Sequence, residues 1–147
     1  MTFPFKHKRI KTHSVKGGLR KRAGQLHFQL LKLQRGEKCE ISNRASNGLG
    51  RFHIFPVSRF PRLEFCEWNI LLENWHPTHS FWHHFGPMDR RNLETVRRIE
   101  AIKGKPWDEL ELEARIKEKI YPKHDEMYLR MLIAGFENEL GARGEGK

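Results

Sequence analysis

Strand-forming sequence is confined to one short stretch in the middle of the chain, and segments with helical spacing lie on both sides of it. The turn-rich segment 39–50 leads into residues 51–57, which read as a short strand that Pro56 stops. Residues 63–72 mix apolar and polar side chains around Asn69. So little strand sequence can form only a small sheet, and the pattern therefore predicts an α+β fold with helices before and after that sheet.

The helices are indicated by apolar residues three and four positions apart and by residues that end such a stripe. Gly36 is placed to end the first helix, and Gly104 is placed to end the second. The helical segments that this spacing predicts are 19–33, 89–103, 106–120 and 125–140.

The length of 147 residues leaves room for one well-buried core. We therefore expect a basic disordered arm at residues 1–18, a single domain at 19–140 and a disordered tail at 141–147. No internal repeat divides the chain further.

Positive charge is concentrated at the start of the chain. Ten of the 28 Lys and Arg residues fall within residues 1–36, which hold no acidic residue, whereas the rest has 18 basic and 18 acidic residues. A concentrated basic segment favours nucleic acid as a partner, because each phosphate that it neutralises releases counterions. The alternative is a solvated basic tail that aids solubility. The basic residues that we expect to hold phosphates are Lys6, Lys8, Arg9, Lys11, Lys16, Arg20, Lys21, Arg22, Arg51, Arg59 and Arg62.

The sequence does not indicate a membrane protein. No stretch approaches the ~18 consecutive apolar residues of a membrane span, and the basic N-terminus lacks the apolar core of a secretory signal. Two cysteines, Cys39 and Cys66, are too few for a disulfide framework and favour a reducing compartment. We expect a cytoplasmic protein, in the host cytoplasm if a phage encodes it, with no membrane partner. The sequence leaves a homodimer open.

Histidines gather in and after the strand segment. Five of the nine fall within 32 residues, and neutral imidazole can act both as a metal ligand and as a base near neutral pH. Beside a basic arm, such a cluster suggests metal-assisted hydrolysis of a phosphodiester. The alternative is that these histidines pack among the Trp and Phe residues around them. The five histidines are His53, His76, His79, His83 and His84.

The order of a base, an orienting amide and metal ligands resembles the HNH, or ββα-metal, nuclease core. The resemblance is closest to the lambdoid phage NinG/Rap recombination endonucleases and covers about residues 14–125. The residues that carry it are the basic helix at 19–33 and Cys39, His53, Pro61, Leu63, Phe65 and Asn69.

The resemblance implies a ββα-metal-like core around residues 39–90 and an endonuclease that acts on branched or flapped DNA during phage recombination. It makes His53 the general base, and it makes Asn69 the residue that positions the His53 loop. It also implies a bound Mg²⁺ or Mn²⁺, for which His79 and His83 are the nearest candidate ligands, with His84 behind them.

The chain departs from the family pattern in its cysteines. The family carries two C-x-x-C pairs that hold a structural zinc, but the first pair here has Ser42 in place of its second cysteine. Asn74 and Pro77 stand where the second pair is expected. A zinc site made by Cys39, His76 and His79 lacks a clear fourth ligand, which makes it a poor structural site. The alternative is an apolar cluster formed by Trp68, Trp75, Phe81 and Trp82.

The metal-ligand position is also shifted, because Thr78 stands where the family pattern expects a ligand and His79 follows it. A non-catalytic nucleic-acid-binding module with a degenerate HNH core is therefore the alternative function. A zinc-organised adaptor for protein interactions is a third interpretation. Convergence of His53 and a second His or Asn on one exposed point would favour the nuclease, and a buried His53 would favour the binding module.

Overall fold

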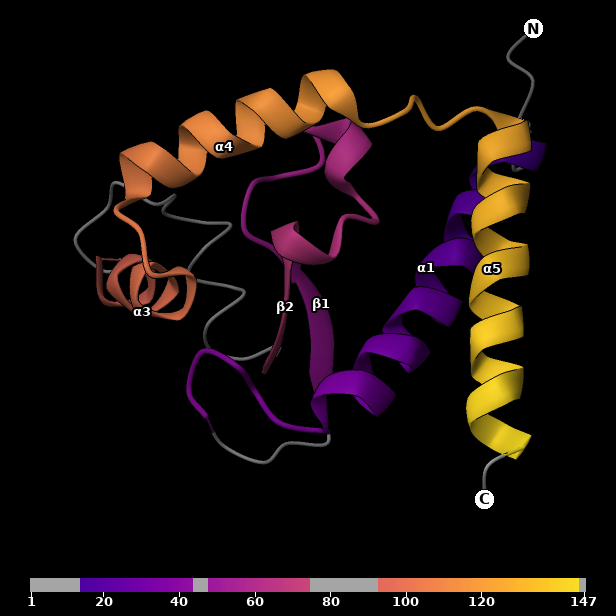
Figure 1. The fold of residues 1–147 in the computed structure, drawn as a ribbon, viewed down its shortest axis with the longest axis horizontal. Coiled ribbons are helices and arrows are strands. Elements are labelled where there is room, and N and C mark those ends of the chain that lie inside the picture. Colours follow the sequence, from indigo (N-terminus) through magenta and orange to yellow (C-terminus); the bar gives the residue numbers. More distant parts are fainter. Residues whose placement is uncertain (1–13, 44–47, 75–92, 146–147) are drawn as a thin grey trace, which may run out of the picture. The chain divides into compact units, whose positions relative to one another are not determined.

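A computed structural model describes residues 14–43, 48–74 and 93–145 of the chain. This part is α+β, as predicted: four α-helices accompany a two-stranded antiparallel sheet (Figure 1). Two 3-10 turns, η1 and η2, lie between the strands. The elements are α1 Val15–Arg35, β1 Leu49–His53, η1 Pro61–Leu63, η2 Glu67–Asn69, β2 Ile70–Asn74, α3 Leu93–Lys103, α4 Trp107–Ile120 and α5 Glu126–Glu145.

The chain divides into two compact units, and the division falls inside α1. The helical unit comprises Met1–Leu26 and His124–Lys147, and the sheet unit comprises His27–Lys123. No helix in the described residues is long and apolar enough to cross a membrane.

The two strands pair so that Phe52 lies opposite Leu71 and His53 lies opposite Ile70. Side chains alternate between the faces of a strand, so Phe52 and Leu71 lie on one face and His53 and Ile70 on the other. We call the first the core face, because its residues pack with α3 and α4. We call the second the α1 face, because Ile70 packs there with Leu31 of α1.

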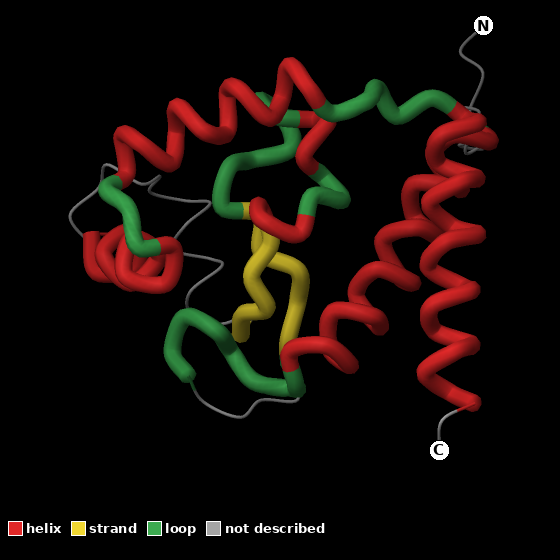
Figure 2. Tube along the Cα trace, viewed as in Figure 1, coloured by secondary structure: helices red, strands yellow, loops and turns green. Residues whose placement is uncertain are grey.

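The core of the sheet unit fills the space between the core face and the helices that follow. Phe55 stacks on Trp68 with ring centroids 5.9 Å apart, and it also contacts Trp107 at the start of α4. Figure 2 shows the loop that links the strands, and α4 contacts the first 3-10 turn of this loop, η1. The fully buried residues of this core include Phe52, Ile54, Leu63, Ile99, Leu110 and Ala114.

The strand predicted at 51–57 is shorter than expected, and Pro56 is not its end. β1 stops at His53 because the side chain of Asn69 takes both backbone groups of Phe55. The second strand, at Ile70–Asn74, begins inside the mixed segment at 63–72 and runs beyond it.

The helices differ from the prediction mainly at their ends. α1 begins at Val15 rather than residue 19, because the Oγ of Ser14 accepts a hydrogen bond from the Gly17 N–H and caps the helix. α1 ends before Gly36, as expected, and Gly36 has a φ of 84°. The last helix continues to Glu145 instead of stopping at residue 140.

The helical unit contains α5 and the first part of α1, which lie side by side (Figure 1). Arg22 of α1 forms an ion pair of 3.6 Å with Glu137 of α5. Ala23 and Leu129 are fully buried.

Candidate functional site

His53 is the last residue of β1 and lies half-buried on the α1 face. Its Nε2 lies 2.9 Å from the carbonyl oxygen of Glu64. A carbonyl oxygen can only accept, so Nε2 must carry the hydrogen in this contact. In the neutral imidazole Nδ1 then holds the lone pair, which makes Nδ1 the nitrogen that can take up a proton.

Asn69 is fully buried and braces the turn that follows His53. Its Oδ1 accepts a hydrogen bond of 2.9 Å from the Phe55 N–H, and its Nδ2 donates one of 3.0 Å to the Phe55 carbonyl. Nδ2 also lies 3.4 Å from the Leu63 carbonyl, directly before Glu64. The backbone adds a bond of 2.9 Å from the Ile54 N–H to the Asn69 carbonyl. One buried amide thus fixes both the residues after His53 and the segment that orients its ring.

Arg51 lies two residues before His53 and on the same face of β1. Its Nη1 lies 3.4 Å from Nδ1 of His27 and 3.5 Å from the Glu64 carbonyl, and its guanidinium lies over the ring of Phe65. Burial lowers the pKa of Arg51, and the charge of Glu64 raises it in part. Arg51 and His53 therefore converge on the same carbonyl oxygen.

Sequence reasoning did not identify His27, which is only 1% exposed. Burial lowers the pKa of His27 to about 3, and the charges of Arg51, Arg35 and His53 add to that effect. The imidazole is therefore neutral at physiological pH. Its position gave a signal, since His27 shares the helical stripe of Ala23 and Leu30, where a polar side chain needs a partner.

The metal ligands expected from the resemblance lie outside the described residues. This applies to His79, His83 and His84, and His76 of the possible zinc site lies there too. Residues 14–43, 48–74 and 93–145 contain no group of three or more His, Cys, Asp or Glu side chains that could hold a metal ion. A metal site with three such ligands would therefore need at least one ligand from outside these ranges.

Cys39, the cysteine of the incomplete zinc site, is fully buried in the core of the sheet unit. Burial raises the pKa of its thiol, but hydrogen bonds from Ser42, Asn74 and Ile41 together outweigh this and lower the pKa below the usual value. The Ser42 N–H lies 3.4 Å from Sγ. Ser42 occupies the position of the second cysteine in the C-x-x-C pattern. It hydrogen-bonds to the sulfur of Cys39.

The basic residues expected to hold phosphates fall into three groups. Lys16, Arg20, Lys21 and Arg22 lie exposed on α1. Arg59 is exposed and lies 3.9 Å from Glu111, whereas Arg62 donates to the Tyr121 carbonyl and so ties the loop to the end of α4. Those outside the described residues are Lys6, Lys8, Arg9 and Lys11.

A second titratable group lies on the core face of the sheet. Glu73 is fully buried on β2, and burial together with the charge of Cys39 raises its pKa to about 8. It lies on the same face as Leu71 and therefore on the opposite face from His53. Glu73 is thus not part of the His53 cluster.

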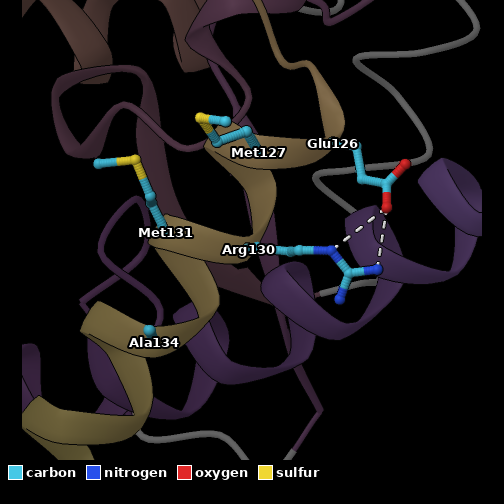
Figure 3. A pocket seen from close by; sticks show the side chains of 5 residues that line it. All are labelled: Glu126, Met127, Arg130, Met131 and Ala134. Carbon is cyan, nitrogen blue, oxygen red and sulfur yellow. Dashed lines mark hydrogen bonds and ion pairs between the residues drawn. The ribbon is translucent and has the colours of Figure 1, made fainter.

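A hollow of about 590 Å³ lies in the helical unit along one side of α5 (Figure 3). Two methionines and Ala134 line it, and its two charged side chains neutralise each other, because Arg130 donates to Glu126 at 2.9 Å. Nothing in this lining resembles the chemistry of the His53 cluster.

The candidate site is therefore the group formed by His53, Asn69, Arg51 and His27 in the sheet unit. Comparison of the chain with protein-family models, curated proteins and solved structures found no significant match. The group contains an oriented imidazole that can accept a proton and a half-buried cation beside it. Such a pair suits attack by water on an anionic substrate.

Proposed function

We propose that the chain is an HNH-type endonuclease that needs a divalent metal and cleaves branched or flapped DNA in phage recombination. His53 acts as the general base: its Nδ1 takes a proton from the water that attacks phosphorus. Mg²⁺ or Mn²⁺, held by His79, His83 or His84, would polarise the phosphodiester and offset the charge of the leaving group. The choice of branched DNA comes from the family resemblance alone.

The observation that carries this proposal is the bracing of the His53 turn by Asn69. A general base is effective only when its ring is held within hydrogen-bond reach of the attacking water. Three hydrogen bonds of Asn69 fix Ile54 and Phe55, which follow His53, and another reaches the Leu63 carbonyl. The Glu64 carbonyl sets the tautomer of His53. A histidine that served only to pack the sheet would not need this support.

The charge distribution supports DNA as the substrate. The net positive charge of the chain comes from residues 1–36, because the rest has equal numbers of basic and acidic residues. The described part of that segment includes four exposed cations on α1. Contacts of this kind hold the phosphate backbone and carry little sequence information.

The test is cleavage of a labelled branched duplex and a linear duplex, each with Mg²⁺, Mn²⁺ or EDTA. We expect cleavage with metal and none with EDTA. His53→Ala should lower the single-turnover rate by about 10²–10⁴-fold, the usual share of general-base catalysis, with DNA affinity unchanged. The matched control is His124→Ala, which removes a half-buried histidine that stacks on Tyr128 outside the candidate site.

Two outcomes would overturn the nuclease proposal. A His53→Ala protein that cuts at the wild-type rate would exclude His53 as the base. A wild-type protein that binds DNA tightly but cuts with neither metal would favour the non-catalytic binding module.

A further inference from the structure

His27 and Arg51 come from different elements and meet on the α1 face. The Nη1 of Arg51 donates toward Nδ1 of His27 at 3.4 Å, and the ring of Phe65 lies beneath the guanidinium and beside the imidazole. A guanidinium has no acceptor and cannot lose its proton in a protein, so His27 must be the acceptor in this contact.

The contact requires His27 to remain neutral. Arg51, Arg35 and His53 all disfavour a proton on His27, and burial disfavours it more strongly. Among the described residues, the acidic group that acts on Arg51 is Glu64, which favours the charge on Arg51. The neutral imidazole thus accepts a hydrogen bond from Arg51 and leaves its positive charge in place. A carboxylate in the same position would cancel that charge.

The edge of Arg51 that carries Nε and Nη2 makes no hydrogen bond to the described residues, and we assign the ligand to this edge. Both hydrogen bonds that Arg51 makes to described residues use Nη1. Nε and Nη2 form the side of a guanidinium that binds two oxygens of a phosphate at once. Because Arg51 and His53 share the Glu64 carbonyl, an anion on that edge would lie beside His53.

We propose that His27 is a positioning residue that holds Arg51 beside His53, so that the guanidinium binds a phosphate oxygen of the nucleic acid. The proposal rests on the proposed function for the identity of the ligand, DNA. It adds that His27 sets the position of Arg51 for its contact with phosphate.

The experiment measures affinity for a short duplex in EDTA, where no cleavage can occur, at a series of salt concentrations. His27→Leu and His27→Phe remove the acceptor, whereas His27→Gln keeps one. We expect Leu and Phe to weaken binding about tenfold and to reduce the salt slope by about 0.9, the loss of one phosphate contact, and Gln to restore both. In an Arg51→Gln background, His27→Leu should have no further effect on affinity.

Several results would overturn the proposal. A lowered melting temperature with unchanged affinity and salt slope in the Leu and Phe variants would make His27 a core residue only. Failure of both variants to fold, with a folded Gln variant, would lead to the same conclusion.

These outcomes are distinguishable from failure of the nuclease proposal. A wild-type protein that does not cut but shows the His27 effect on binding would retain this inference and lose the nuclease. Normal cleavage by the wild type without the His27 effect on binding would retain the nuclease proposal and exclude this inference.

Discussion

The two faces of the small sheet carry titratable groups that differ in burial. On the α1 face, Arg51 and His53 are half-buried and converge on one carbonyl oxygen. On the core face, Phe52 is buried in the apolar core, and Glu73 is fully buried with a pKa raised to about 8. One five-residue strand therefore contributes to a candidate site with one face and to the core with the other.

This difference shows how a sheet of two strands can serve both purposes. Phe52 and His53 are neighbours in sequence, yet the alternation of a strand separates them completely. A change at Phe52 should lower stability, and a change at His53 should lower the rate of cleavage.

Phe52→Ala gives the largest expected effect on stability. Phe52 is 1% exposed in the core of the sheet unit, and a Phe→Ala change in a core costs about 3–5 kcal/mol of unfolding free energy. His53→Ala, on the half-buried face, should cost far less. Urea unfolding of both variants measures the difference, and equal losses would show that the two faces are not energetically distinct.

Asn69→Ala should lower stability and cleavage together, because Asn69 braces the end of the sheet where both faces meet. The change leaves the N–H and carbonyl of Phe55 without their side-chain partner, at about 1–3 kcal/mol for each buried group. Urea unfolding and single-turnover cleavage check the two effects. Asn138→Ala, at an exposed position on α5, is the control. Full cleavage activity in a destabilised Asn69→Ala protein would show that Asn69 supports the fold but is not needed to position His53 for catalysis.

The α+β class and the approximate helices could be predicted because they depend on local patterns. Apolar spacing and end signals located α3 and α4 closely, and Gly36 marked the end of α1. The end of β1 could not be predicted locally, because a side chain sixteen residues away terminates the strand.

The candidate site was predicted in part. His53 and Asn69 were identified from the order of residue types, but His27 was not, because its role depends on a contact across 24 positions with Arg51. Arg62 was expected to hold phosphate, yet its guanidinium ties the loop to Tyr121. Sequence shows that such a residue is basic, whereas only the fold shows which group it contacts.

The effect of Glu73→Gln on stability depends on pH. The folded-state pKa of about 8 exceeds the usual 4.5, so the protonated carboxyl stabilises the fold fully below about pH 4.5. That contribution is lost as the pH rises toward 8, because the unfolded chain releases the proton first. Glutamine resembles the protonated carboxyl and does not titrate. The variant should therefore match the wild type near pH 4.5 and melt a few degrees higher at pH 8.

The comparison separates Glu73 from His27, because His27 acts in the opposite direction and is present in both proteins. The lowered pKa of His27 gives a contribution that is complete above about 6.5 and is lost as the pH falls toward 3. It therefore cancels in the difference between variant and wild type. Glu109→Gln, at an exposed position on α4, should leave the pH profile unchanged. Parallel melting curves for Glu73→Gln and wild type from pH 5 to 8 would mean that the core face holds an ordinary carboxylate, and the contrast between the two faces would then be one of burial alone.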